Sequence, residues 1–209
     1  MGMAVEYFKN ITVRIGGLHY IRSIDDAIDL SFAAALGFTG IENIIAFTEM
    51  FSGGNPSIAG DPIVMTKVFL IREFFVLPVH LFTSGLFGYF YGMALFSGKE
   101  LQEKNRASIW FQILSAPLFF LPPPRQFRAV KIVQGTLLSG LFYGLFFAFL
   151  QINPHISTLF HALGMPTLPV DESLVLLMSF VLFKVGTILF FALLDKKRRW
   201  ERQGLFAEQ

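Results

Sequence analysis

The sequence predicts an all-α fold, a polytopic transmembrane helix bundle, and three observations support this prediction. Hydrophobic residues make up 54% of the 209 residues, charged residues only 15%, and the mean hydropathy is +0.57, which is too apolar for an ordinary soluble domain. Four stretches approach or exceed the ~20 apolar residues that a helix needs to cross a bilayer. These stretches are apolar on every side, whereas the strands of a membrane barrel alternate apolar and polar residues.

The four predicted spans are residues 27–47, 74–96, 132–150 and 173–194. A further apolar segment, 109–121, is too short to span comfortably and is followed by three prolines, so we predict that it is interfacial or re-entrant. The chain shows no internal repeat and no low-complexity tract. We therefore expect a single membrane domain over residues 1–209.

The positions of the basic residues predict how the bundle is oriented. Lysines and arginines cluster before the first span, after the second, before the third and after the fourth. The positive-inside rule places all four clusters in the cytoplasm. The loops 48–62 and 151–172 contain no lysine or arginine and are expected outside. The chain thus crosses the cell membrane several times, and its C-terminus is cytoplasmic.

Composition also excludes several kinds of site. The sequence has no cysteine, which rules out disulfides, thiolate ligands and cysteine nucleophiles, so that a metal would take nitrogen or oxygen ligands. The formal net charge is only +2, and the basic residues lie beside hydrophobic spans and form no stripe interleaved with aromatic residues. This pattern argues against nucleic-acid binding. The lipid bilayer is the expected partner.

Ionisable residues inside predicted spans usually mark function, and Glu42 and His80 are the two to explain here. Glu42 is about six residues from the outer end of the first span, and His80 is about six from the outer start of the second. On antiparallel neighbours both would lie ~9 Å below the outer boundary. A carboxylate and an imidazole suit zinc, with a bound water completing a catalytic shell. The same pair can instead hydrogen-bond and fix helix packing, and the spacing leaves both interpretations open.

Four elements occur in order along the chain: Glu6-Tyr-Phe-Lys9, then Phe38-Thr-Gly-Ile-Glu42-Asn43, then Arg72, and then Pro78-Val-His80. This ordered set resembles the PrsW family of intramembrane metalloproteases, which is distantly similar to the type II CAAX prenyl proteases. The resemblance covers roughly residues 5–150. It implies a protease that cuts membrane-anchored proteins, such as anti-sigma factors, by means of a water activated by zinc or another divalent metal.

The resemblance also implies roles for individual residues. Glu6 would act as general base and Lys9 belongs to the same motif, while Glu42 and His80 would bind the metal, although Glu6 and the ligands can exchange roles. Asn43 and Arg72 would support the site.

The sequence departs from the family pattern at three positions. Val5 stands where the family has the first glutamate of its first motif. In the fourth motif, Ser139 stands where the family has histidine and Tyr143 where it has aspartate. A protein ligand is then missing, and His161 would replace it only if the outer loop folds inward. The family has membrane helices ahead of its first motif, so we also expect the chain to lack N-terminal helices.

These observations leave competing functions. The leading hypothesis is a PrsW-like intramembrane metalloprotease. The alternative is a catalytically inactive homologue that binds membrane segments of partner proteins, and it is motivated by Val5, Ser139 and Tyr143. A transporter or channel is least favoured, because the sequence shows no symmetric halves with helices broken at corresponding positions.

Overall fold

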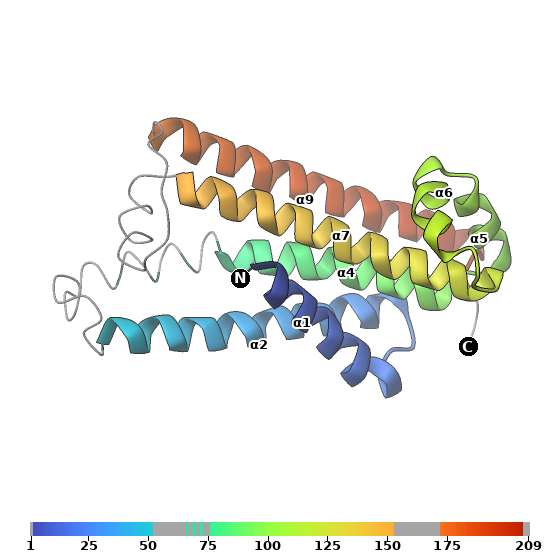
Figure 1. Ribbon diagram of the computed structural model, residues 1–209, viewed down its shortest axis with the longest axis horizontal. Coiled ribbons are helices and arrows are strands. Elements are labelled where there is room, and N and C mark those ends of the chain that lie inside the picture. The colour runs from blue at the N-terminus through green and yellow to red at the C-terminus, as the bar shows by residue number, and fades with distance from the viewer. Residues whose placement is uncertain are drawn as a thin grey trace.

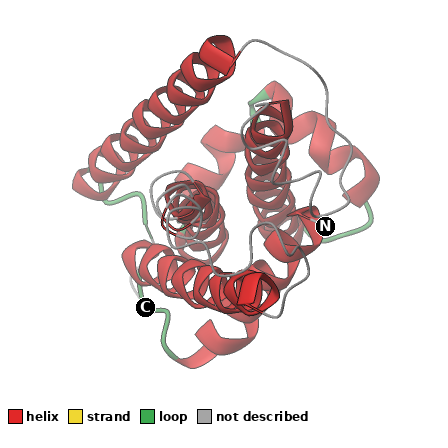
Figure 2. Ribbon diagram, turned by 90° about the vertical axis from the view of Figure 1, so that its left-hand side faces the viewer, coloured by secondary structure: helices red, strands yellow, loops and turns green. Residues whose placement is uncertain are grey.

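The computed structural model describes residues 2–51, 66, 69, 72, 76–152 and 172–206, and within these residues the regular elements are helices. In chain order they are α1 Gly2–Gly16, η1 Gly17–His19, α2 Ile24–Phe51, α4 Leu77–Phe96, α5 Lys99–Arg106, α6 Ile109–Ser115, η3 Ala116–Leu118, α7 Pro123–Ile152 and α9 Glu172–Arg202. Figure 2 views the bundle from the end opposite α5 and α6 and shows helices joined by loops. The predicted all-α class is confirmed.

Three helices are long and apolar enough to cross a membrane, namely Ile24–Thr48 in α2, Leu77–Phe96 in α4 and Pro123–Phe146 in α7. They correspond to the first three predicted spans. The fourth, 173–194, lies within α9, a helix of 31 residues, and its insertion stays a prediction. Figure 1 shows α2, α4, α7 and α9 running lengthwise, and α4 packs against both α2 and α7.

Glycines let the backbones of α2 and α4 approach closely. A Cβ atom at Gly88 would lie 2.7 Å from the carbonyl oxygen of Ala27, and one at Gly92 would lie 2.9 Å from Cα of Ile24. The sequence pattern Gly88-x-x-x-Gly92 predicts this close packing. The same prediction for Gly140 is wrong, because a Cβ there would meet nothing within 4 Å. Gly140 lies on α7 among exposed leucines, on a face that the bundle leaves uncovered.

The first helix, α1, crosses the bundle obliquely in Figure 1 and packs against α7, α2 and α4. With 15 residues it is shorter than a membrane crossing requires. Its inner face buries Val13 in a cluster with Ala27, Phe87 and Tyr91, while Phe8 on the other side is exposed. This docking carries the first motif to the middle of the bundle.

The end of the bundle where α4 ends and α7 begins is built from short helices (Figure 1). The predicted short segment is observed as α6 and η3, a short apolar helix over Ile109–Leu118. Trp110 on this helix is 67% exposed, and Phe119, which directly follows it, is 82% exposed; the interfacial or re-entrant location of the segment stays a prediction. At the same end, Lys197 of α9 lies 2.6 Å from an oxygen of Asp25 and 2.8 Å from an oxygen of Glu201, which ties α9 to the start of α2.

Candidate functional site

His80 occupies the centre of the candidate site. Its side chain is completely buried in the first turns of α4. Pro78 lies in the first turn of α4 as the structure describes it, and Val76, the residue before this helix, also has helical backbone angles.

Glu42 of α2 meets His80, as the depth argument predicts. Glu42 Oε2 lies 3.2 Å from His80 Nε2, and the Glu42 side chain is 27% exposed. The two helices are antiparallel neighbours, and α-helical side chains tilt toward the N-terminus of their own helix, which brings residues from opposite directions to one level. This contact is observed; the proposed role of the pair as metal ligands is a separate matter.

Lys9 contacts the other nitrogen of the same ring. Lys9 Nζ lies 3.0 Å from His80 Nδ1, and the lysine is only 1% exposed. A lysine ammonium donates hydrogen bonds and accepts none, so with Lys9 charged Nδ1 is the acceptor. The remaining ring proton then lies on Nε2, which faces Glu42. Three helices thus meet in a chain of contacts from Lys9 through His80 to Glu42.

Arg72 and Asn43 lie around the glutamate, as expected for supporting residues. A terminal nitrogen of Arg72 is 3.8 Å from Glu42 Oε2, and Arg72 Nε donates a hydrogen bond to Asn43 Oδ1 at 2.5 Å. The carboxylate therefore has a guanidinium on one side and an imidazole on the other. Buried or half-buried charges need such partners in an apolar environment.

Helix α7 carries Ser139 and Tyr143, the two positions predicted to belong to the fourth motif, and it brings Tyr143 to the site. The ring of Tyr143 lies 5.2 Å from that of His80, centroid to centroid. Ser139 is completely buried and its hydroxyl donates to the carbonyl of Thr136 at 3.1 Å. The helix thus places an aromatic ring beside His80 where the family pattern has aspartate. Sequence reasoning marked Tyr143 only as a divergent position and missed this contact.

Other predicted site residues lie outside what the structure describes. The backbones of Val5 and Glu6 belong to α1, but their side chains are not described, and His161 lies outside the described residues. Their predicted roles stay predictions. Within the described part of the chain no three histidine, cysteine, aspartate or glutamate side chains gather as a metal-binding group.

The buried polar atoms Asn10 Nδ2, Thr39 Oγ1 and Ser84 Oγ have no hydrogen-bond partner in the described part of the chain. Asn10 follows Lys9, Thr39 precedes Glu42 by three residues, and Ser84 follows His80 by four. Buried polar atoms nearly always have a protein or water partner. Sequence reasoning did not find these three, because nothing in their local pattern distinguishes them from other small polar residues in a span.

A comparison with family models decides the affiliation. The model described as PrsW family intramembrane metalloprotease matches residues 2–120. The chain belongs to the PrsW family. The matched region includes Lys9, Glu42 and His80 and ends before α7, so Ser139 and Tyr143 lie beyond it. No curated protein and no solved structure matches the chain. Together with the three apolar helices, this affiliation makes the chain a multi-pass membrane protein of an intramembrane metalloprotease family.

The PrsW affiliation implies a metal, and the donor set tests how well one fits. Two ligands at ~2.1 Å from a tetrahedral zinc lie ~3.4 Å apart, and the observed separation of Glu42 Oε2 and His80 Nε2 is 3.2 Å. Those two atoms fit two positions of one coordination shell. Lys9 does not fit, because a metal-bound histidine usually donates its other N–H to an acceptor. A third protein ligand would come from residues whose side chains the structure does not describe.

Proposed function

We propose that this PrsW-family protein is an intramembrane metalloprotease that hydrolyses peptide bonds of membrane-anchored proteins at the Glu42–His80 pair. The 3.2 Å contact between Glu42 Oε2 and His80 Nε2, formed between two apolar helices, carries the proposal. Zinc, when bound, supplies an activated water and polarises the peptide carbonyl. A membrane-anchored anti-sigma factor is the substrate class that the family resemblance suggests.

The surroundings of Glu42 support access for a membrane substrate. His80 is completely buried, whereas Glu42 remains 27% exposed, so the site opens on the α2 side. Ile41 and Ile44 beside Glu42 are 57% and 68% exposed, and a Cβ at Gly40 would meet nothing within 4 Å. Gly40 and Ile44 lie two residues from Glu42 and therefore point to the opposite side of α2, so access to the carboxylate is supported by its own 27% exposure.

The chain's own residues hold this arrangement. Arg72 offsets the charge of Glu42 and orients it, Lys9 fixes the plane of the His80 ring, and Tyr143 packs against the ring.

A second candidate function is binding of membrane segments without cleavage. It is favoured by Lys9, because a charged Lys9 at Nδ1 leaves the proton on Nε2 and removes the lone pair that a metal needs. The described network of Lys9, His80, Glu42 and Arg72 then satisfies itself without a metal. Ser139, whose hydroxyl bonds within its own helix, points the same way.

The deciding experiment measures zinc per chain and cleavage of a membrane-anchored anti-sigma reporter by the purified protein. The proposal expects about one zinc per chain, with both zinc and cleavage lost in His80→Ala and Glu42→Gln. His19→Ala is the matched control, since His19 is exposed on η1, and it should retain both. Wild-type protein that binds the reporter but contains no zinc and cleaves nothing would refute the protease and support the second candidate.

The second candidate has its own test. A triple variant, Val5→Glu with Ser139→His and Tyr143→Asp, restores the family pattern at the three divergent positions. If the wild type is an inactive homologue, this variant should acquire zinc and cleave the reporter. Cleavage already present in the wild type, and abolished by His80→Ala, would refute the second candidate.

A further inference from the structure

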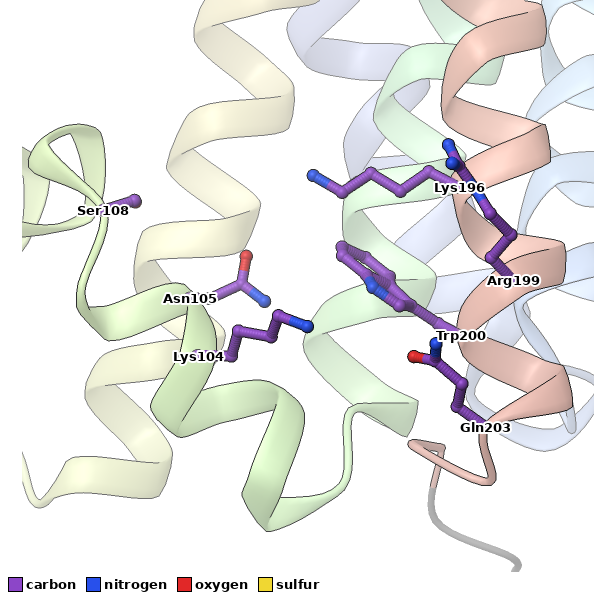
Figure 3. Close-up of a pocket in the computed structure, with 7 residues that line it drawn as sticks. All are labelled: Lys104, Asn105, Ser108, Lys196, Arg199, Trp200 and Gln203. Atoms are coloured by element: carbon purple, nitrogen blue, oxygen red, sulfur yellow. The ribbon is translucent and has the colours of Figure 1, made fainter.

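A pocket of about 400 Å³ opens at the end of the bundle where α5, the turn before α6, and α9 meet (Figure 3). Its lining residues are Lys104, Asn105, Ser108, Lys196, Arg199, Trp200 and Gln203. Three of them are cationic and none is acidic. The pocket is far from the Glu42–His80 pair along the chain and takes no part in the function proposed above.

The two lysines enter this pocket from opposite walls, Lys104 from α5 and Lys196 from α9 (Figure 3). Within the described residues neither forms a salt bridge, whereas Arg199 is paired with Asp195 at 3.2 Å. Lys196 Nζ lies over the ring of Trp200, 4.7 Å from its centroid, and this cation–π contact holds the lysine in place. Two lysine charges therefore face the same space without a described counter-ion.

A third cation lies directly behind the wall. Lys131 of α7 is only 6% exposed, and its ammonium donates to Asn105 Oδ1 at 3.0 Å and to Gln134 Oε1 at 3.2 Å. Both acceptors are neutral. A buried ammonium with only neutral partners is unfavourable unless an opposite charge lies nearby. Since Asn105 lines the pocket, an anion bound there would offset the charge of Lys131 as well as those of the two lysines.

The predicted spans place the pocket at headgroup depth. Lys104 is in the helix that follows the span in α4, and Lys196 comes two residues after the predicted span 173–194. Trp200 is of the residue type that favours the membrane interface. The volume of about 400 Å³ is at the lower end of the ~300–1,000 Å³ typical of ligand sites and leaves room for a phosphate with its esterified groups.

We propose that this pocket binds the phosphate group of an anionic ligand, with Lys104 and Lys196 as its charged contacts and Asn105 held in place by Lys131. A lipid headgroup and a soluble phosphate present the same chemistry. Basic pockets between membrane helices on the cytoplasmic side are suited to anionic headgroups, and the depth of the pocket favours the lipid.

The test is native mass spectrometry of the full chain released from micelles with equal amounts of phosphatidylglycerol and phosphatidylcholine. The wild type should retain one phosphatidylglycerol in preference to phosphatidylcholine. The double variant Lys104→Gln with Lys196→Gln should bind it about 30-fold more weakly, or ~2 kcal/mol at ~1.4 kcal/mol per tenfold change. Lys99→Gln with Arg198→Gln is the matched control: it removes two exposed charges from the same two helices outside the pocket lining and should bind like the wild type.

Each outcome has a definite meaning. An equal loss in both double variants would show general attraction to basic residues and would overturn the proposal. A second arm adds inorganic phosphate alone and follows thermal unfolding of the protein. If phosphate stabilises the protein through Lys104 and Lys196 but phosphatidylglycerol is not preferred, the pocket binds phosphate and the proposed lipid ligand is overturned. No preference and no stabilisation in a folded wild type would overturn the site. Since both lysines are exposed, their substitution should not prevent folding. The single variant Lys104→Glu provides an independent check, because the repulsion between the new carboxylate and the phosphate should abolish lipid retention.

Discussion

Substituting Gly88 by alanine tests whether close packing of α2 on α4 holds the bundle together. The added Cβ would lie 2.6 Å from Ser31 Oγ and 2.7 Å from the carbonyl oxygen of Ala27. These two oxygens are already joined, because the Ser31 hydroxyl donates to that carbonyl at 2.7 Å. The methyl group is about 0.7 Å short of the 3.4 Å at which ordinary contact begins. Because one neighbour is backbone, the helices must separate.

Overpacking of this kind costs ~1–3 kcal/mol, and we expect Gly88→Ala to lower the free energy of unfolding by that amount. The assay is unfolding of purified protein in mixed micelles with increasing denaturing detergent. Gly140→Ala is the control, because a Cβ there meets nothing within 4 Å; it should leave stability nearly unchanged. If Gly88→Ala is as stable as Gly140→Ala, the close approach of α2 and α4 is refuted.

Three further predictions address the end of the bundle near the C-terminus. Burial lowers the pKa of Lys197, but its hydrogen bonds to the Asp25 and Glu201 carboxylates outweigh burial and raise that pKa above the ordinary value. These contacts therefore stabilise the fold fully below pH ~10.4 and less as the pH rises further. In detergent unfolding, Lys197→Met should lower the free energy of unfolding by ~1 kcal/mol at pH 7 and by less at pH 11. Trp110 on α6 is 67% exposed, whereas Trp200 is 8% exposed. In vesicles with lipids brominated near the headgroup, the Trp200→Phe variant, which retains Trp110, should therefore keep most of the quenching of tryptophan fluorescence. Loss of that quenching would contradict an interfacial α6. The chain has no cysteine, so a single introduced cysteine can be labelled selectively. With the predicted orientation, Arg202→Cys should react with an impermeant maleimide only after cells are opened, whereas Ser57→Cys should react in intact cells. The reverse pattern would invert the predicted orientation.

The helical fold was predictable because hydrophobic length and backbone hydrogen bonding leave few alternatives in a membrane. The predicted spans 27–47 and 74–96 match the apolar helices Ile24–Thr48 and Leu77–Phe96 within three residues at each end, whereas the predicted span 132–150 starts nine residues after the observed Pro123–Phe146. The docked position of α1 was not predictable, because 15 residues of mixed polarity give no length signal. Its inner face is determined by contacts with α7 and α4, which are far away in sequence.

Equal depth in two antiparallel spans joined by one outer loop permits a contact between Glu42 and His80, but the observed contact also depends on the rotation of α2 and α4 about their axes. The contact of Lys9 with His80 Nδ1 could not be predicted from depth, since it depends on how α1 crosses the bundle. The contact of Tyr143 with the same ring depends on the rotation of α7 about its axis. Local spacing carries neither kind of information.

The packing of α1 against α7 bears on how the protein is made. Lys9 and Tyr143 contact the same imidazole, but Tyr143 is synthesised more than a hundred residues after Lys9. At ~5–20 residues per second, roughly 7 to 27 seconds of translation separates them. The first predicted spans therefore insert before α7 has brought Tyr143 to the His80 ring. Any reactivity of the site toward neighbouring membrane proteins is delayed until synthesis of the chain is nearly finished.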